Sequence, residues 1–365
     1  MIGSDRLFLK AAIDLAMQGL NTCAPNPAVG CVIVRHGRII GRGYHARTGS
    51  AHAEVNAIAD AGGDVTGATV YVSLEPCAFV GRTPACAQTL IDAGVARVVI
   101  AAEDPHPQVA GAGMAMLRAA GIEVALRLQP AALTLLRGYT SRIQRARPWV
   151  RIKTASSMDG ATALASGESK WITGATARND VQRWRARSDA IITGVGTVLA
   201  DDPQLNVRAA ECLPCEQPLR VILDRRLRTP AHAKVVTDGA ATLLVHDVAT
   251  QVPPALQDRP GVSFAALPVD DSMLGTLLEI LAQRGCNEVL VEAGARLIGS
   301  FTAQRLWDEW LCYLAPSWLG NDTRRLASFQ LPALAQAPRG EMCDITPLGD
   351  DVLVRLERAD KEAQS

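Results

Sequence analysis

The stretch "SAHAEVNAI", residues 50–58, places His52 two residues before Glu54. On an α-helix, residues two apart point to nearly opposite sides, so this pair would not share a helix face. The apolar pattern, however, predicts that the helix starts at about Ala53. A residue at a helix entrance need not follow helical geometry, and from there His52 can face the same point as Glu54. We therefore expect a joint chemical role for the two side chains.

The stretch "SLEPCAFVGRTPAC", residues 73–86, supplies partners for this pair. A β-rich run ends, a proline forces a turn, Cys77 comes next, and Cys86 opens a helical pattern. One histidine and two cysteines can hold zinc with three protein ligands and leave the fourth position for water. Zinc lowers the pKa of that water, and Glu54 is the predicted proton carrier between the water and a departing amine. The His-x-Glu and Pro-Cys arrangement is the signature of zinc deaminases.

Other interpretations of these residues stay open. A His-x-Glu pair at a helix start is often a cap or a surface pair, and two separated cysteines are often core residues. A closed structural zinc site is intermediate and needs a fourth protein ligand, for which His45 is the best candidate. Cys212 and Cys215 form a Cys-x-x-Cys pair, but no second pair accompanies them, so we interpret that segment as a loop.

The length of 365 residues exceeds one typical domain and fits two domains or one large one. The 37 basic and 37 acidic residues balance, so we expect no nucleic-acid partner and no membrane-surface partner. The N-terminal "MIGSDRLFLKAAIDLAMQGL" mixes charged and apolar residues and predicts an amphipathic helix capped by Ser4, not a signal peptide. No apolar run approaches the roughly 20 residues that a membrane span needs. We expect a cytoplasmic enzyme.

The nine cysteines are scattered, and their odd number favours a reduced, cytosolic protein over a disulfide framework. Cys77 and Cys86 are assigned to the zinc site. Five others stand alone among apolar or loop residues, and we predict that they pack in the core: Cys23, Cys31, Cys286, Cys312 and Cys343.

Strand and helix patterns alternate along the first third of the chain. "VGCVIVR" and "RIIGRGYH" flank "HG" as in a hairpin, and helical patterns separate the strand-like "TVYVSL", "ARVVIA" and "IEVAL". This alternation predicts an α/β layered sandwich. Pro148 disfavours helix in the residue before it, so we place a domain boundary near residue 147. A second α/β series follows, with helices predicted over about 176–187 and 273–284.

The second half lacks a complete G-x-G-x-x-G fingerprint after a strand, which argues against a Rossmann domain. In "TGVGTVLADDP", Gly194 and Gly196 still let backbone approach a phosphate, and Thr197 can donate to it. In "EVLVEAGARLIGSF" a strand, Gly294 and a helix follow one another, and that helix N-terminus can receive a pyrophosphate. Both segments are equally compatible with tight strand-to-helix turns.

Several long motifs together resemble one family. "PNPAVGCVIV", "GYHARTGSAHAE", "LEPCAFVGRTPAC" and "EDPHPQVAGAG" closely resemble the deaminase half of the RibD family of bifunctional riboflavin biosynthesis proteins. That family separates its zinc cysteines by eight residues, as this chain does. "KTASSMDGATALASGESKWITG", "AIITGVGTVLADDPQLNVR" and "VEAGARLIGSF" look like its reductase half. The resemblance covers nearly the whole chain.

The resemblance implies a cytidine-deaminase-like α/β/α sandwich over residues 1–147 and a dihydrofolate-reductase-like α/β domain over residues 148–365. It implies a first half that is a zinc-dependent hydrolase. On this resemblance, the first half would remove the 2-amino group of 2,5-diamino-6-(5-phosphoribosylamino)pyrimidin-4-one as ammonia. It implies a second half that is an oxidoreductase, reducing the ribosyl chain of 5-amino-6-(5-phosphoribosylamino)uracil to ribityl with NADPH. A homo-oligomer, dimer or tetramer, is implied as well.

The resemblance also implies roles for particular residues. His52, Cys77 and Cys86 would bind zinc and Glu54 would move protons. The deaminase substrate would contact Asn26, His45 and Arg82. NADPH would contact Lys153, Ala155, Trp171, Thr173, Thr197, Asp201, Gly294, Ala295, Arg296, Leu297, Ile298, Gly299 and Ser300. The reductase substrate would contact Ser169, Arg185, Leu205, Arg208 and Glu292.

Physical chemistry supports some of the reductase roles. Arg185 and Arg208 can clamp a phosphate, and Glu292 can hold an aminopyrimidine or a sugar hydroxyl. The alternative is that Arg183, Arg185 and Arg187 form only a solvated helix face.

One segment departs from the family pattern. Where the family commonly has Ser-His followed by His or Tyr after the first zinc cysteine, this chain has Ala78, Phe79 and Val80. The zinc ligands are intact, but a polar rim has become apolar. Two alternatives therefore stand beside the bifunctional enzyme. One is a reductase with an altered or inactive deaminase half, and the other is a non-enzymatic pyrimidine-binding scaffold.

Overall fold

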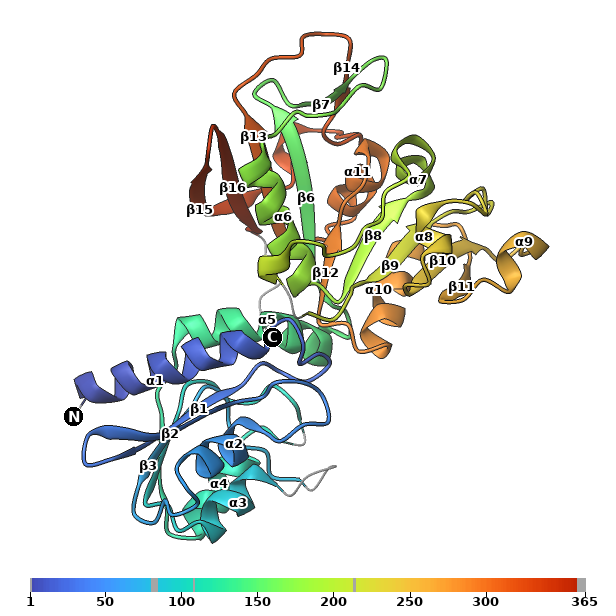
Figure 1. Ribbon diagram of the computed structural model, residues 1–365. Coiled ribbons are helices and arrows are strands. Elements are labelled where there is room, and N and C mark those ends of the chain that lie inside the picture. Colours follow the sequence, from blue (N-terminus) through green and yellow to red (C-terminus); the bar gives the residue numbers. More distant parts are fainter. Residues whose placement is uncertain (1, 80–84, 108, 213–214, 360–365) are drawn as a thin grey trace. The chain divides into compact units, whose positions relative to one another are not determined.

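The computed structural model describes residues 2–79, 85–107, 109–212 and 215–359. The chain divides into two compact units, Met1–Arg147 and Pro148–Ser365 (Figure 1). Each unit is built around its own β-sheet.

The first unit contains a five-stranded sheet in the order β2-β1-β3-β4-β5. Its strands are β1 (Gly30–Arg35), β2 (Arg38–Tyr44), β3 (Thr69–Val72), β4 (Arg97–Ile100) and β5 (Glu123–Leu126). The predicted hairpin is confirmed: β1 pairs with β2, and His36 and Gly37 turn between them with φ of 52° and 73°. Strands β3, β4 and β5 run parallel, so their carboxyl ends meet at one edge.

Helices cover both faces of this sheet. On one face lie α1 (Ile2–Ala16) and α5 (Pro130–Arg145); on the other lie α2 (Ala53–Asp60), α3 (Cys86–Asp92) and α4 (Ala112–Ala119). A short 3-10 helix, η1 (Met17–Gly19), follows α1. The α/β/α sandwich is therefore as predicted. The predicted cap is wrong, because α1 begins at Ile2 and Ser4 lies inside its first turn.

The second unit contains a nine-stranded sheet in the order β11-β10-β9-β8-β12-β6-β13-β16-β15. Its strands are β6 (Trp149–Ser157), β8 (Ala190–Gly194), β9 (Leu219–Leu223), β10 (Thr242–Asp247), β11 (Val262–Leu267), β12 (Glu288–Val291), β13 (Glu309–Ala315), β15 (Gly340–Leu348) and β16 (Asp351–Arg358). The strands from β11 to β13 in the sheet order run parallel. Strand β16 runs antiparallel to both of its neighbours, β13 and β15. Strands β7 (Ala161–Leu164) and β14 (Thr323–Arg325) form a separate pair.

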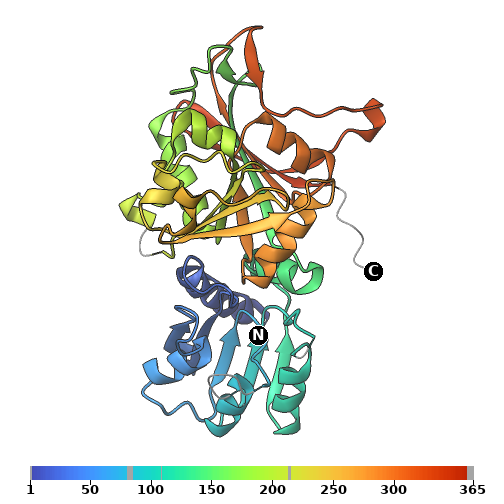
Figure 2. The ribbon, with the colours of Figure 1, turned by 90° about the vertical axis from the view of Figure 1, so that its right-hand side faces the viewer.

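Helices also cover both faces of the larger sheet (Figures 1 and 2). One face packs against α10 (Met273–Gln283) and α11 (Ala295–Ala303). The other packs against α6 (Ala175–Arg187), α7 (Val195–Asp201), α8 (Lys234–Thr237) and α9 (Pro254–Gln257). The 3-10 helices η2 (Ala210–Cys212) and η3 (Leu334–Gln336) lie in connections. The two long helices predicted here, over about 176–187 and 273–284, are confirmed as α6 and α10.

A buried ion network ties the central strands of the second unit together. The guanidinium of Arg151, which is fully buried, donates to Glu288 at 2.5 Å and to Glu309 at 2.6 Å. Arg187 also pairs with Glu288 and Arg355 with Glu309, each at 2.7 Å. Because a buried charge without a partner is strongly destabilising, the strands and α6 must keep this arrangement. Arg187 is therefore not part of a merely solvated helix face.

All nine cysteines are free. Cys23, Cys31 and Cys286 are buried as predicted, and Cys312 is half-buried. Cys343 is exposed on the edge strand β15, so its predicted core position is wrong.

Strand β2 and helix α2 approach each other through glycine. A Cβ atom at Gly43 would collide with the backbone of Ala53 and Ala57 in α2. We predict that Gly43→Ala lowers the free energy of unfolding by ~1–3 kcal/mol, because the first turn of α2 must move away. Gly275→Ala is the matched control, since a Cβ there would meet no atom within 4 Å. Urea unfolding measures the free energy of unfolding of both variants. An unchanged value for Gly43→Ala relative to the wild type would contradict the proposed close packing.

Candidate active sites

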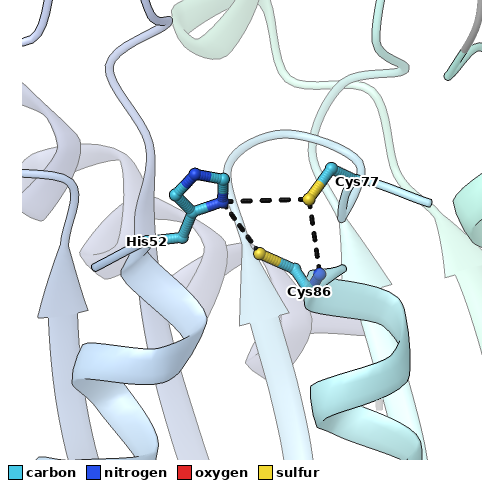
Figure 3. A group of neighbouring side chains, drawn as sticks. All are labelled: His52, Cys77 and Cys86. Atoms are coloured by element: carbon cyan, nitrogen blue, oxygen red, sulfur yellow. Dashed lines mark hydrogen bonds between the residues drawn. The ribbon is translucent and has the colours of Figure 1, made fainter. Parts of the chain in front are cut away.

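His52, Cys77 and Cys86 form a compact cluster in the first unit (Figure 3). The His52 Nδ1 atom lies 3.0 Å from the Cys86 sulfur and 3.8 Å from the Cys77 sulfur. The backbone N–H of Cys86 donates to the Cys77 sulfur at 3.3 Å. One ligand atom from each residue lies within 4.8 Å of the others.

Three different elements bring these ligands together. His52 is the N-cap of α2, with extended backbone (φ −72°, ψ 165°), so it leaves the helical path as predicted. Cys77 follows the end of β3, and Cys86 is the first residue of α3. The unusual spacing of His52 and Glu54 therefore arises because the helix begins between them.

Asn56 holds the entrance of α2 and was missed in the sequence. Its side-chain Nδ2 donates to the carbonyl of Tyr44 at 2.9 Å and to that of Ala51 at 3.3 Å. Since Ala51 immediately precedes His52, Asn56 fixes the backbone from which the imidazole projects. Its spacing of four residues from His52, one helical turn, was the available signal.

The donor set fits zinc with an open coordination position. Two thiolates and one imidazole nitrogen are ligands that zinc prefers, and this cluster is the one group of its kind within the described ranges. His45, the candidate fourth ligand of a closed site, is engaged elsewhere. Its Nε2 lies 3.0 Å from Asn26 Nδ2 and its Nδ1 lies 3.2 Å from the Ala51 carbonyl oxygen. This arrangement favours a catalytic site over a closed structural one.

Burial and mutual contacts shift the ionisation of these groups. Burial raises the pKa of Glu54, with a further contribution from Cys77. The hydrogen bond from Cys86 lowers the pKa of Cys77 to about 4, and the same bond raises that of Cys86. The hydrogen bond to Cys77 raises the pKa of His52. A bound cation would favour both thiolates by its own charge. Glu54 is thus a buried carboxyl group suited to take up and release a proton.

The residues predicted to contact the deaminase substrate are partly brought together. The ring of His45 lies edge-on to that of His52, with centroids 5.3 Å apart, and His45 contacts Asn26. Burial lowers the pKa of His45, which favours a neutral imidazole. Arg82 and Val80 lie outside the described residues. Phe79, two residues after Cys77, is 49% exposed, so an apolar ring faces solvent there.

Glu75 is a second residue that the sequence did not reveal. Its buried carboxylate accepts hydrogen bonds from the backbone N–H groups of Gly111 and Met114, both at 3.0 Å. It therefore anchors the start of α4 to the loop that carries Cys77. A glutamate two residues before a predicted ligand was the only signal.

The second unit brings together three residues predicted for the reductase site. Arg185 on α6 donates from Nε and Nη2 to the carboxylate of Glu292, at 2.6 and 3.0 Å, and from Nη1 to the Asn206 carbonyl at 3.2 Å. Burial lowers the pKa of Lys153, which the charge of Glu292 partly offsets. The charge of Arg185 is thus already neutralised by Glu292. Arg208 is exposed, and its backbone N–H donates to Gln182 at 3.0 Å.

The two glycine segments, "TGVGTVLADDP" with Gly194 and Gly196 and "EVLVEAGARLIGSF" with Gly294, lie side by side. They follow β8 and β12, which are adjacent parallel strands, and a Cβ at Gly194 would lie 3.9 Å from the Leu297 side chain. A Cβ at Gly196 or at Gly294 would meet no atom within 4 Å, so backbone is open to a ligand at both places. This open backbone beside the start of α11 fits a dinucleotide pyrophosphate. Figure 1 shows α7 and α11 at the same end of the sheet.

Not every residue of the segment 294–300 faces the open backbone at Gly294. Ile298 is buried in the core, and a Cβ at Gly299 would collide with the Ser328 backbone, so both contribute packing. Arg296 and Ser300 are exposed, whereas Ala295 and Leu297 are half-buried.

The remaining predicted contacts lie on neighbouring segments. Trp171 is 71% exposed, and the guanidinium of Arg178 lies 4.3 Å from its ring centroid. The Thr173 carbonyl accepts from Arg178 at 2.5 Å. The others differ in exposure: Ala155, Ser169 and Thr197 are half-buried, Asp201 is exposed and Leu205 is buried with φ of 49°.

Comparison with known proteins finds a matching family model for each unit. The family model for the RibD C-terminal domain matches residues 148–354, and that for the cytidine and deoxycytidylate deaminase zinc-binding region matches residues 3–102. The chain is 44% identical to RibD of Haemophilus influenzae, over 95% of this chain and 96% of the relative. It is 41% identical to RibD of Escherichia coli, over 96% and 99%.

Solved structures of similar proteins superpose on the whole chain. Form 1 of Acinetobacter baumannii RibD superposes with a TM-score of 0.91 at 44% identity, covering 98% of this chain and 99% of that one. The Thermotoga maritima diaminohydroxyphosphoribosylaminopyrimidine deaminase/5-amino-6-(5-phosphoribosylamino)uracil reductase superposes with a TM-score of 0.87 at 32% identity, again over 98% and 99%.

A cytidine-deaminase-like unit and a dihydrofolate-reductase-like unit in one chain define a bifunctional enzyme, a zinc-dependent deaminase followed by a reductase. The matches extend over nearly the full length of the relatives, so the family can be named as well. The chain belongs to the RibD family of riboflavin biosynthesis proteins. Within the described ranges, every helix is too short or too polar to cross a membrane.

The zinc assignment predicts a selective loss of metal. Cys77→Ser should reduce zinc from a stoichiometric amount to a small fraction, because it removes one of three protein ligands. Cys343→Ser, which changes an exposed cysteine, should keep the full amount. Metal analysis of protein prepared without chelator measures both. Stoichiometric zinc in Cys77→Ser would remove Cys77 from the site.

Proposed function

We propose that this chain catalyses two successive reactions on a phosphoribosylaminopyrimidine. Residues 1–147 remove the 2-amino group of 2,5-diamino-6-(5-phosphoribosylamino)pyrimidin-4-one by hydrolysis. Residues 148–365 reduce the ribosyl chain of the product, 5-amino-6-(5-phosphoribosylamino)uracil, to ribityl with NADPH. The observation that carries the first activity is the His52, Cys77 and Cys86 cluster with the buried Glu54 beside it.

In the first reaction His52, Cys77 and Cys86 would hold zinc. Bound zinc supplies a nucleophile near neutral pH by lowering the pKa of a water ligand. Glu54 takes a proton from the attacking water and gives it to the departing amino group, so that ammonia leaves as a neutral molecule. Its burial excludes bulk water from this transfer. The pair of Asn26 and His45 offers hydrogen bonds to a polar ring or to a phosphate.

We predict that Glu54→Gln lowers the rate of ammonia release by about 10²- to 10⁴-fold while zinc stays bound, because the amide keeps the shape but cannot carry the proton. Ammonia release and zinc content are measured on the same preparation. NADPH oxidation with the deaminated substrate is the internal control and should not change. Undiminished deamination would remove Glu54 from the mechanism.

In the second reaction the chain chiefly positions the reactants. Bound NADPH supplies the hydride, so no protein nucleophile is needed. The Arg185 ion pair fixes Glu292 at the carboxyl end of β12, where its carboxylate can accept from the pyrimidine or a ribosyl hydroxyl. Lys153 lies beside this pair. Because Arg185 is paired with Glu292, we assign the binding of the substrate phosphate to the exposed Arg208.

For the reductase we predict that Arg208→Ala raises the KM for the deaminated substrate about 10- to 100-fold, since one charge-assisted hydrogen-bonding group is lost. The KM for NADPH should stay the same. Arg183→Ala is the matched control, because Arg183 is 71% exposed on α6 and pairs weakly with Asp180 at 4.0 Å. NADPH absorbance measures all three proteins. Failure of the wild type to oxidise NADPH with this substrate would contradict the reductase function.

The apolar Phe79 supports one alternative, in which the deaminase half is altered or inactive and the reductase works alone. Assay of both steps on the wild type separates the two functions. Reduction of supplied 5-amino-6-(5-phosphoribosylamino)uracil without ammonia release from the diamino compound would favour the reductase alone.

We further infer a homo-oligomer in the cytoplasm. The edge strand β15 supports association, because it exposes Met342 and Ile345 beside unpaired backbone groups. The free cysteines are consistent with a reducing compartment. Sedimentation of the purified protein measures its assembly state.

A further inference from the structure

The loop that carries Asn26 is held in place through its backbone carbonyl groups. Residues 23–26, "CAPN", are called the Asn26 loop here. The Thr48 hydroxyl donates to the Cys23 carbonyl at 2.8 Å and to the next carbonyl along the chain at 2.9 Å. The Asn26 N–H also donates to the Cys23 carbonyl, at 2.9 Å. Pro25, which lies between these residues, is held from much farther along the sequence.

Arg142 on α5 holds Pro25. Its guanidinium Nη2 donates to the Pro25 carbonyl at 2.8 Å, across 117 residues of sequence. Proline has no N–H group, so this carbonyl is its one main-chain group that can form a hydrogen bond. Because Asn26 follows directly, a displacement of the Pro25 peptide also displaces Asn26. The bond therefore ties a residue proposed to contact the deaminase substrate to the position of α5.

A second side chain of α5 steadies the Arg142 guanidinium. Tyr139 precedes Arg142 by three residues, on the same face of the helix, and the guanidinium carbon is 5.6 Å from the centroid of its ring. The face of an aromatic ring attracts a cation at this distance. The Tyr139 hydroxyl donates in turn to the buried Asp104 carboxylate at 3.4 Å, which also accepts from the His106 N–H at 2.8 Å. Helix α5 thus contacts both the Asn26 loop and the loop that follows β4.

The Asn26 loop reaches the zinc cluster through a short series of contacts. Asn26 Nδ2 lies 3.0 Å from His45 Nε2, and the ring centroids of His45 and His52 are 5.3 Å apart. His52 is a zinc ligand in the proposed site. The position of the Asn26 amide relative to a substrate at the zinc therefore depends on the Pro25 peptide. A small displacement of the amide reduces binding, because a hydrogen bond weakens steeply away from its best distance and angle.

We propose that Arg142 is a positioning residue of the deaminase, which holds Asn26 through the Pro25 carbonyl where its amide can bind the pyrimidine substrate. The inference rests on the proposed deaminase function of residues 1–147. It adds to that function a side chain that acts through Asn26 and not on the substrate itself. Loss of Arg142 should therefore lower the affinity for substrate, while zinc binding and the proton transfer by Glu54 stay unchanged.

Equilibrium binding to the full chain tests the proposal. The Glu54→Gln protein serves as the parent, since we expect it to keep zinc and to convert the substrate very slowly. Calorimetry gives the Kd of 2,5-diamino-6-(5-phosphoribosylamino)pyrimidin-4-one for this parent and for variants made in it. We expect Arg142→Ala to raise the Kd about 10-fold and Arg142→Lys, which keeps a donor, to raise it about threefold or less. Arg118→Ala, which removes an exposed arginine in the last turn of α4, should leave the Kd unchanged.

A double-mutant cycle separates positioning from a general structural role. Asn26→Ala removes the amide through which Arg142 acts, so adding Arg142→Ala to it should change the Kd less than about twofold. A loss of packing would instead weaken binding by the same factor with and without the amide. With Glu54 restored, Arg142→Ala should raise the KM for ammonia release about 10-fold and change kcat less than about twofold. The zinc content of each variant should match that of its parent.

The outcomes distinguish this inference from the proposed function. An unchanged Kd for Arg142→Ala, in a parent that binds the substrate, would overturn the role of Arg142 and leave the deaminase function standing. Equal weakening with and without the Asn26 amide would overturn it too, as would loss of zinc from Arg142→Ala. A parent without measurable affinity for the diamino compound would contradict the deaminase function itself, and the inference with it.

Discussion

Both candidate sites depend on one constraint, the common direction of several strands in one sheet; in the first unit β2 and β3 share a direction because both run antiparallel to β1. Strands of common direction are joined by crossovers, so their carboxyl ends meet at one edge, together with the loops and helix starts that follow them. In the first unit Cys77 follows β3 at this edge, while His52 and Cys86 sit at the starts of α2 and α3. In the second unit the ends of β8 and β12 place the two glycine segments side by side. Segments that are distant in the sequence thus become neighbours in space.

Close backbone contacts and buried charges keep these edges in place. In the first unit Gly43 lets α2 lie against β2, and the Glu75 carboxylate binds the start of α4. In the second unit Arg151 lies between two glutamates, and Arg185 holds Glu292 with two hydrogen bonds. Because a buried charge that loses its partner is costly, each pair restricts where its strands can lie. Rigid support of this kind is what a site needs in order to hold substrate in one geometry.

Much of this organisation was visible in the sequence, for identifiable reasons. The hairpin was predictable because His36 and Gly37 tolerate a left-handed turn, and α6 and α10 because their patterns are long. The edge strand β15 was not found, since its exposed residues lack the alternation that burial imposes. For the same reason Cys343 was wrongly placed in the core. Asn56 and Glu75 escaped notice because their partners are backbone groups, which leave no mark in a sequence.

The sequence alone determined the chemistry available to this protein: a His-x-Glu pair, two cysteines with eight residues between them, and glycines after strands. These are local features, and residue type and spacing express them fully. Only the tertiary structure decided which groups act together. It engaged the two ring nitrogens of His45 with Asn26 and Ala51, which leaves His45 out of the ligand set. It turned Ile298 inward from a segment expected to meet NADPH. It also engaged Arg185 with Glu292. Those outcomes depend on contacts between distant segments, where packing and charge pairing select one arrangement from many.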